Sequence, residues 1–327
     1  MKLIKRILII LGVVAIIAVA WFVYRANDHP GLGCCSQQMF GVDKESVSGL
    51  SVTFLGVSTL LFEDGETAIL TDGFFTRPGK LRFLFTRIEP DRDLITQQLQ
   101  RAGIHNLAAV VVVHSHYDHA MDAPEVAKQT GAQLVGSQST ANIALGYGFP
   151  KEKLTVVGDS ARMHFGRFQI TLLTSGHVPS RLAPMGNIEH LLKSPAWWRQ
   201  YKEGGSYSVL IEHDGKSILV QGSAGFKPEA LNGRHADVVF LGIGQLGNQD
   251  DAYRELYWQQ VVAAVRPRRI IPIHWDDFWL PLDQPLVPFP RLADNFEKSM
   301  DFLNRRGQQE NIEVKLLPAW LKVDPFQ

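Results

Sequence analysis

The sequence contains almost no cysteine. Its 327 residues include only two, the adjacent Cys34 and Cys35. Two neighbouring cysteines cannot build the disulfide framework that holds many small secreted domains together, so a hydrophobic core must stabilise this chain. A bridge to another chain, a strained bridge within the pair and attachment of a lipid all stay open, and we assign the pair no catalytic role.

The sequence also lacks an excess of charge of either sign. Lys and Arg together number 33, as do Asp and Glu, so the formal net charge is zero. Proteins that bind nucleic acids usually carry a basic patch, so we predict no nucleic-acid partner. Zinc-finger and Walker motifs are absent. The GxGxxG letters of "GIGQLG" at 242–247 lack the helix start and acidic partner of a dinucleotide site, which favours turn glycines.

Long hydrophobic runs are missing except at the N-terminus. Basic residues at positions 2, 5 and 6 precede an uncharged run from Ile7 to Tyr24, which Arg25 ends. The run, about 18 residues long, is just sufficient for a helix to cross the roughly 30 Å hydrocarbon layer of a membrane. Basic residues before the run favour an N-terminus in the cytoplasm and the body of the protein outside it, on the periplasmic or extracellular side.

A cleaved signal peptide is the alternative to this anchor. Ala18-Val19-Ala20 has the small-x-small pattern of a cleavage site, and cleavage near Ala20 would give a secreted protein. The apolar run continues beyond that site, which favours an uncleaved anchor. The predicted organisation is an anchor or signal segment at 1–25, a linker at 26–49 and a globular domain at 50–327. No feature of the sequence predicts an oligomeric state.

Short strands dominate the predicted domain. Runs of β-branched and aromatic residues bounded by turn residues predict strands, and helical periodicity predicts a few helices between them. The strands are predicted at 50–56, 58–65, 66–73, 110–113, 132–137, 168–176, 236–244 and 269–275, with a hairpin at 206–222 and helices at 91–102 and 123–130. This pattern suits two stacked sheets with helices outside.

Four candidate metal ligands follow the most apolar of these strands. In "VVVHSHYDHAMD" at 111–122, an uninterrupted valine run predicts a strand buried on both faces, and His114, His116, Asp118 and His119 come directly after it. Side chains at a strand-to-loop junction can point toward one centre, and imidazole and carboxylate groups are zinc ligands. A solvated polar loop is the alternative, but the dense HxHxDH spacing favours a metal site.

Three further candidates occupy comparable positions. His177 follows the strand "QITLLTSG", His274 follows "RRIIPI" and Asp72 follows "TAIL". Taken alone, each is more typical of an ordinary loop residue than of a metal ligand. Their repetition at strand ends favours one shared site.

The order of these residues resembles the metallo-β-lactamase superfamily over residues 50–280. The stretches "FLGVSTLLFEDGETAILTDGFF" and "HYDHAMD" resemble the branch that contains sugar-phosphate lactonases and N-acyl-phosphatidylethanolamine phospholipase D enzymes. The resemblance implies an α+β fold, a four-layer αβ/βα sandwich with metals in a cleft at the sheet ends. It implies one zinc held by His114, His116 and His177, a second held by Asp118, His119 and His274, and Asp72 in the outer shell.

One position departs from the superfamily pattern. Where the family usually has an aspartate that bridges two metals, the matching stretch "ILVQGSAGF" at 218–226 has Ser223. A neutral serine cannot bridge two cations as a carboxylate does. One zinc, two zincs without this bridge and a non-catalytic zinc-binding scaffold of the same fold therefore all stay open. The carboxylate of Asp276, two residues after His274, could compensate for the missing bridging aspartate.

With the chemistry intact, the resemblance implies a zinc-dependent hydrolase. Zinc lowers the pKa of a bound water to about 7, and the resulting hydroxide can attack an ester, lactone or phosphodiester. Asp118 is the predicted catalytic residue, because it would orient or deprotonate that water.

Two segments are predicted to form the walls of the cleft. They are an insertion at 179–205 and an aromatic-rich segment at 274–290. The candidate substrate contacts in the insertion are His190, Trp197, Trp198 and Arg199, and packing of the tryptophans onto the body is the alternative. Apolar walls favour a small-molecule or lipid-like substrate.

Overall fold

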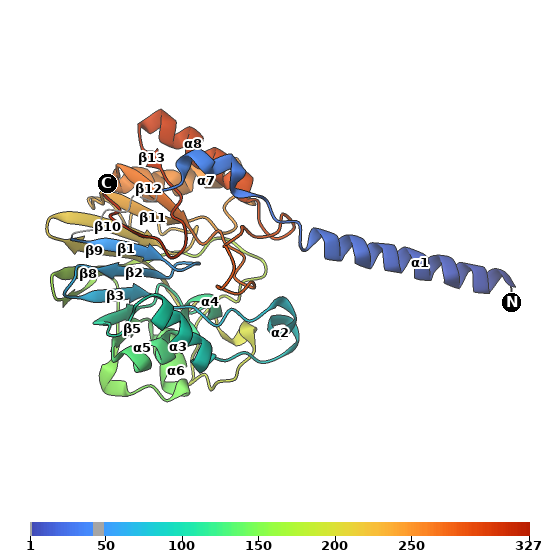
Figure 1. The fold of residues 1–327 in the computed structure, drawn as a ribbon, viewed down its shortest axis with the longest axis horizontal. Coiled ribbons are helices and arrows are strands. Elements are labelled where there is room, and N and C mark those ends of the chain that lie inside the picture. The colour runs from blue at the N-terminus through green and yellow to red at the C-terminus, as the bar shows by residue number, and fades with distance from the viewer. Residues whose placement is uncertain (1, 42–48) are drawn as a thin grey trace.

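Two sheets face each other and carry helices on their outer sides (Figure 1). The computed structural model describes residues 2–41 and 49–327. The first sheet contains β1 (Ser51–Phe54), β2 (Leu60–Glu63), β3 (Ala68–Thr71), β4 (Ala109–Val111), β5 (Gln133–Gly136), β6 (Leu154–Val156) and β14 (Lys322–Val323). The second contains β7 (Ala161–Phe165), β8 (Phe168–Ser175), β9 (Ser206–His213), β10 (Lys216–Gln221), β11 (Val238–Gly242), β12 (Arg269–Ile273) and β13 (Glu313–Val314). The strand orders are β14-β1-β2-β3-β4-β5-β6 and β13-β12-β11-β10-β9-β8-β7.

The helices complete a four-layer arrangement. They are α1 (Lys2–Arg25), α2 (Lys80–Phe85), α3 (Arg92–Arg101), α4 (Tyr117–Ala120), α5 (Ala123–Thr130), α6 (Gln138–Tyr147), α7 (Asp251–Tyr257) and α8 (Phe296–Glu310), with the short segments η1 (Leu32–Gln38), η2 (Lys151–Lys153), η3 (Trp198–Gln200) and η4 (Trp258–Ala263). In Figure 1, α3, α5 and α6 cover the first sheet, and α7 and α8 cover the second. The predicted sandwich is therefore confirmed.

The valine run before the histidine motif contributes to two cores. Val111 and Val113 lie in the core between the two sheets. Val110 and Val112 lie in the second core, which the first sheet forms with its helices. Successive side chains of a strand point to opposite faces, so this alternation confirms a strand buried on both sides.

Parallel pairing brings several strand ends to one edge. Strands β3, β4 and β5 pair in parallel in the first sheet, and β10, β11 and β12 do so in the second. Neighbouring parallel strands end at the same edge of a sheet. Asp72 after β3 and His114 after β4 therefore come side by side, and His274 follows β12 in the facing sheet.

The strands that the sequence did not predict are the edge strands. They are β6 and β14 in the first sheet and β7 and β13 in the second. Their side chains are partly exposed, so they lack the apolar runs of central strands. Helices α2, α4, α6, α7 and α8 were also missed.

Part of the segment predicted as a linker packs on the domain. Residues 32–38 form η1, in which Cys35 is buried in the core between the sheets. Met39 forms a bridge to Leu316. Within 26–49, residues 42–48 lie outside the described part of the chain.

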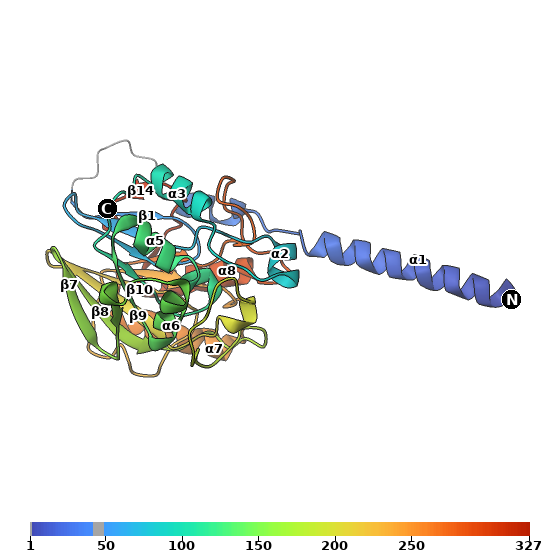
Figure 2. The same cartoon turned by 90° about the horizontal axis from the view of Figure 1, so that it is seen from below.

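Helix α1 projects away from the domain in both views (Figures 1 and 2). The stretch Ile4–Arg25 is long and apolar enough to cross a membrane, and a signal sequence would have the same character. Its side chains have no protein core to pack against, since most of them are exposed.

Candidate metal centre

Six side chains that follow three strands, β4, β8 and β12, converge at the edge of the two sheets. The structure brings them together as two groups: His114, His116 and His177, and Asp118, His119 and His274. The ring centroids of His114 and His119 are 3.8 Å apart, so the two groups are adjacent. Within each group, one donor atom from each residue lies within 4.8 Å of the others.

The spacing within the groups suits metal ligands. With metal–nitrogen bonds of about 2.0 Å, two ligand atoms of a tetrahedral zinc lie about 3.3 Å apart. Nε2 of His114 is 3.1 Å from Nδ1 of His116. In the second group, Oδ2 of Asp118 is 3.5 Å from Nε2 of His119 and 3.4 Å from Nε2 of His274, and the two nitrogens are 3.1 Å apart. The three distances in the second group and the His114–His116 distance in the first therefore suit a tetrahedral metal.

Hydrogen bonds to the far nitrogen fix the orientation of three of the rings. Nε2 of His116 donates to the carbonyl of Pro184 at 3.0 Å, and Nδ1 of His177 donates to the carbonyl of Val178 at 2.8 Å. The opposite nitrogen of each ring then carries a lone pair toward the centre. Such partners set the tautomer and the ring orientation of metal-binding histidines.

Asp72 orients the third ring. Its Oδ2 accepts from Nδ1 of His119 at 2.8 Å, and its Oδ1 accepts from the backbone N–H of Val113 at 2.9 Å. Ser58, a residue that the sequence reasoning missed, donates to the same carboxylate at 2.5 Å and lies 2.9 Å from His119 Nδ1. Asp72 thus lies behind a candidate ligand, where the resemblance placed it.

Burial keeps the first group neutral, and neighbouring imidazoles keep the carboxylate of Asp118 charged. Burial lowers the pKa of His114 well below its ordinary value, and the neighbouring imidazoles lower it further. Burial also lowers the pKa of His177, to about 3. Burial raises the pKa of Asp118, but the imidazoles of His119 and His274 outweigh this effect and hold that pKa below its ordinary range. The first group therefore offers neutral nitrogen donors, as a divalent metal requires, beside the ionised carboxylate of Asp118. In the second group, burial lowers the pKa of His119, but the carboxylates of Asp118 and Asp72 outweigh this effect and raise it.

A protein-family model that is described as the beta-lactamase superfamily domain matches residues 67–275 of the chain. The chain belongs to the metallo-β-lactamase superfamily. The more specific branch of lactonases and phospholipase D enzymes stays a prediction.

Relatives agree with this assignment. A "UPF0173 metal-dependent hydrolase" of Heliobacterium modesticaldum is 25% identical over 261 residues, which cover 76% of this chain and 92% of that protein. A protein of the same description from Staphylococcus aureus strain JH9 is 25% identical over 236 residues, 70% of this chain and 87% of the relative.

Solved structures share the fold. Igni18, described as a novel metallo hydrolase from Ignicoccus hospitalis, superposes with a TM-score of 0.53 at 17% identity, covering 84% of this chain and 97% of that one. The metallo-β-lactamase fold protein YhfI from Bacillus subtilis gives 0.52 at 15% identity, covering 85% and 99%. At these identities the likeness concerns the fold alone.

Ser223 supports the first group from behind. Its hydroxyl accepts a hydrogen bond from the backbone N–H of Val178 at 3.1 Å, next to His177.

Asp276 does not supply the bridging carboxylate that position 223 lacks. Its side chain is fully buried, and its two oxygens accept from Arg77 at 2.6 Å and from the N–H of Val57 at 2.8 Å. Neither Ser223 nor Asp276 therefore provides a bridging carboxylate to the two candidate metal-binding groups of this metallo-β-lactamase domain.

The glycines of the "GIGQLG" stretch permit close backbone packing at the site. A Cβ on Gly244 would lie 2.9 Å from Nδ1 of His274, and one on Gly242 would lie 2.9 Å from the backbone nitrogen of Ser223. Both contacts are shorter than real Cβ contacts. The sequence prediction of turn glycines is consistent with this packing, since no nucleotide is needed to explain them.

Aromatic rings from three segments form a wall beside the second group. Phe278 lies 5.7 Å from His274 between ring centroids, and Trp279 donates to the hydroxyl of Tyr117 at 3.2 Å. Phe83 of α2 contacts Tyr117 at 5.1 Å and Trp279 at 5.5 Å. The sequence predicts that the segment 274–290 forms a wall of the metal cleft, but it does not predict a contribution from residues 80–85, which form α2.

Of the four predicted substrate contacts in the insertion, Trp198 and Arg199 lie at this wall. Trp198 stacks on Phe83 at 4.7 Å, and the guanidinium of Arg199 lies over Trp198 at 4.9 Å. Trp197 and His190 are exposed, and within the described part of the chain neither makes a hydrogen bond or ring contact with a candidate ligand. The insertion also supplies Pro184, whose carbonyl accepts from His116.

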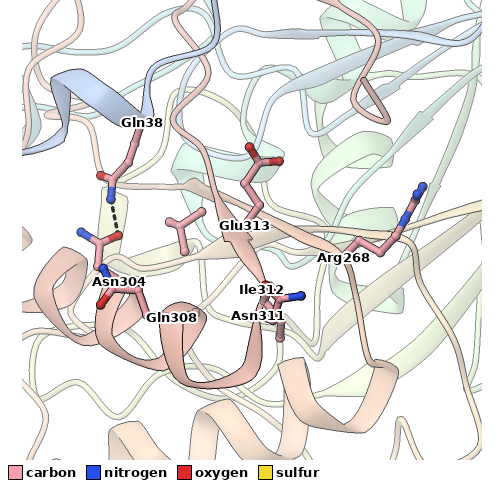
Figure 3. A pocket seen from close by; sticks show the side chains of 9 residues that line it. Gln38, Arg268, Asn304, Gln308, Asn311, Ile312 and Glu313 are labelled. Carbon is pink, nitrogen blue, oxygen red and sulfur yellow. Dashed lines mark hydrogen bonds between the residues drawn. The ribbon is translucent and has the colours of Figure 1, made fainter.

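A cavity of about 460 Å³ lies elsewhere, between α8, β13 and η1 (Figure 3). Gln38 donates to Asn304 across it at 2.6 Å. Its lining contains none of the six candidate ligands, so we assign it no part in the chemistry.

Proposed function

We propose that this protein is a membrane-anchored zinc hydrolase whose catalytic domain lies outside the cytoplasm. The hydrolase class follows from its superfamily and from relatives named as metal-dependent hydrolases. The observation that carries the zinc centre is the pair of buried donor sets with tetrahedral spacing. The anchor rests on the apolar helix Ile4–Arg25 and on the basic residues before it.

The residues of the site suggest how each contributes to hydrolysis. A bound divalent metal would activate water and polarise the bond that is attacked. Asp118 has the ionised carboxylate needed to orient the attacking water and to accept its proton. Asp72 holds His119, and the aromatic wall excludes bulk solvent from one side. Apolar rings beside the centre favour an ester, lactone or phosphodiester on a lipid-like molecule.

A panel of substrates tests this proposal. The full chain in detergent, loaded with zinc, should hydrolyse at least one of these bond classes, with faster turnover for longer acyl chains. Chelation should remove the activity, and added zinc should restore it. Turnover in none of the classes by protein with full metal content would overturn the hydrolase and favour the zinc-binding scaffold that Ser223 suggests.

Ser223→Asp is expected to tighten binding of the second zinc. An added carboxylate beside His177 can bridge two cations, whereas the wild-type hydroxyl cannot. We expect wild-type protein to keep about one zinc per chain against a weak chelator and the variant to keep about two, with at least about tenfold tighter binding of the second ion.

Ser223→Asn is the matched control, since it adds similar bulk without charge. Metal content should be measured by inductively coupled plasma mass spectrometry after equilibrium dialysis. Equal zinc content in all three proteins would mean that position 223 does not limit the second site.

A further inference from the structure

We propose that α2 and the neighbouring insertion form a surface that lies on the lipid bilayer. This surface consists of Leu81, Leu84 and Phe85 of α2 and Leu182, Met185, Leu191 and Trp197 of the insertion. The proposal rests on the membrane anchor proposed above and adds a second contact with the same bilayer. It also gives the metal centre a fixed orientation toward lipid.

Exposed apolar side chains of the catalytic domain are concentrated in this surface. Among residues 49–327, ten large apolar side chains are exposed, and seven of them belong to it. Leu81 is 74% exposed, Phe85 71% and Leu182 83%. A soluble protein rarely gathers such side chains in one place without a partner for them.

Contacts between the two segments bring α2 beside the part of the insertion that carries Trp197. Ile88, just after α2, forms an antiparallel bridge with Ala196 of the insertion. Phe83 stacks on Trp198 at 4.7 Å. Phe83 is itself buried, so α2 turns this one ring inward and its other apolar side chains outward.

The end of the apolar helix is bonded directly to α2. Nζ of Lys80, the first residue of α2, donates to the carbonyl of Ala26 at 2.9 Å and lies 3.4 Å from the carboxylate of Asp277. Ala26 follows the last residue of α1, where the chain would leave the bilayer. In both views α2 lies on the side of the domain from which α1 projects (Figures 1 and 2).

A second set of bonds holds this exit in place. Arg291 donates to the carboxylate of Asp28 at 2.8 Å, and its backbone N–H donates to the carbonyl of Asp28 at 3.0 Å. His29 contacts the carbonyl of Pro288 at 2.8 Å. The domain is therefore attached to the anchor by Arg291 and by Pro288 at the end of the aromatic-rich segment 274–290, and not by a loose tether alone.

These contacts place the start of α2 near the membrane boundary. A helix of six residues is about 9 Å long, and Lys80 at its start bonds to Ala26, so α2 begins one lysine side chain away from the point where α1 ends. Apolar side chains of interfacial helices reach about 5–10 Å into the headgroup region. Exposed Arg82 and Arg87 flank the apolar residues, where they can meet lipid phosphates.

The arrangement gives α2 two faces with different neighbours. Its outward side chains meet lipid, and Phe83 on the inward face contacts the ring wall that leads to His274. The rings that pack α2 onto the domain therefore continue to the candidate ligand His274, so the proposed membrane surface and the candidate metal centre share one packed cluster.

Photocrosslinking to lipid tests the surface on the full chain. The photoreactive p-benzoyl-phenylalanine replaces Phe85 in one variant, Phe22 of α1 in a second and Leu256 of α7 in a third. Each protein is reconstituted into phosphatidylcholine and phosphatidylglycerol vesicles and irradiated, and attached lipid is measured by mass spectrometry. Zinc content equal to that of the wild type shows that each variant is folded.

Lipid attachment at position 85 is expected to exceed that at position 256 by at least about tenfold and to approach that at position 22. Attachment at 22 without attachment at 85 would keep the anchor and overturn the surface. Attachment at 85 without 22 would keep the surface and overturn the anchor. Attachment at neither position would overturn both, and crosslinking of position 85 to a second copy of the chain would replace the bilayer by a protein interface.

Discussion

Replacing His116 with alanine is expected to lower kcat/KM at least about 1,000-fold, a loss of about 4 kcal/mol of transition-state stabilisation. Nδ1 of His116 is one of three nitrogens in the first group, and its ring is held by the carbonyl of Pro184. Two remaining histidines cannot complete a zinc site that needs three protein ligands. The zinc content of the variant should fall together with its activity.

His164→Ala is the matched control for this variant. His164 is an exposed histidine on β7, far along the chain from the motif and outside both donor groups. Its loss should leave zinc content and turnover unchanged. If His116→Ala kept both the wild-type zinc content and the wild-type rate, the first group would not be the metal centre.

The main parts of the site were predictable because strand ends carry a local signal. His114, His177 and His274 each follow an apolar run, and parallel strands end at a common edge. The sequence therefore indicates both the residue types and the edge where they meet. Their roles as ligands stay a prediction, and the structure contributes the distances that make a shared metal reasonable.

Other parts needed the three-dimensional structure because their partners are distant in sequence. Ser58 gains its role from Asp72 and His119, and nothing in its own neighbourhood distinguishes it from other serines. Helix α2 is too short to show periodicity, so neither its position nor the inward turn of Phe83 could be predicted.

Helix α8 is a different case, since its signal was present. Its buried residues Phe296, Met300, Leu303 and Gly307 recur at helical spacing. This element could have been predicted, whereas the edge strands could not, because their partly exposed residues form no apolar run.

A buried ion pair joins three segments behind the metal centre. Arg77 and Asp276 are both fully buried and 2.6 Å apart. Asp276 also accepts from the N–H of Val57, whose carbonyl accepts from the N–H of His274 at 2.7 Å. Gly56 leaves room for the pair, because a Cβ there would overlap the guanidinium of Arg77. The pair therefore fixes the backbone from which His274 projects.

Arg77→Met is expected to lower the free energy of unfolding by about 3–5 kcal/mol, because it leaves the Asp276 carboxylate buried without its cation. Asp276→Asn keeps an oxygen for the N–H of Val57 but leaves the guanidinium without its anion, so it should also destabilise the protein. The double variant removes both charges and should be more stable than the sum of the two single losses predicts. Urea denaturation of the metal-free proteins, followed by circular dichroism, measures all three. Additive losses would show that the two charges do not interact, and a loss below about 1 kcal/mol for Arg77→Met would show that water reaches the pair.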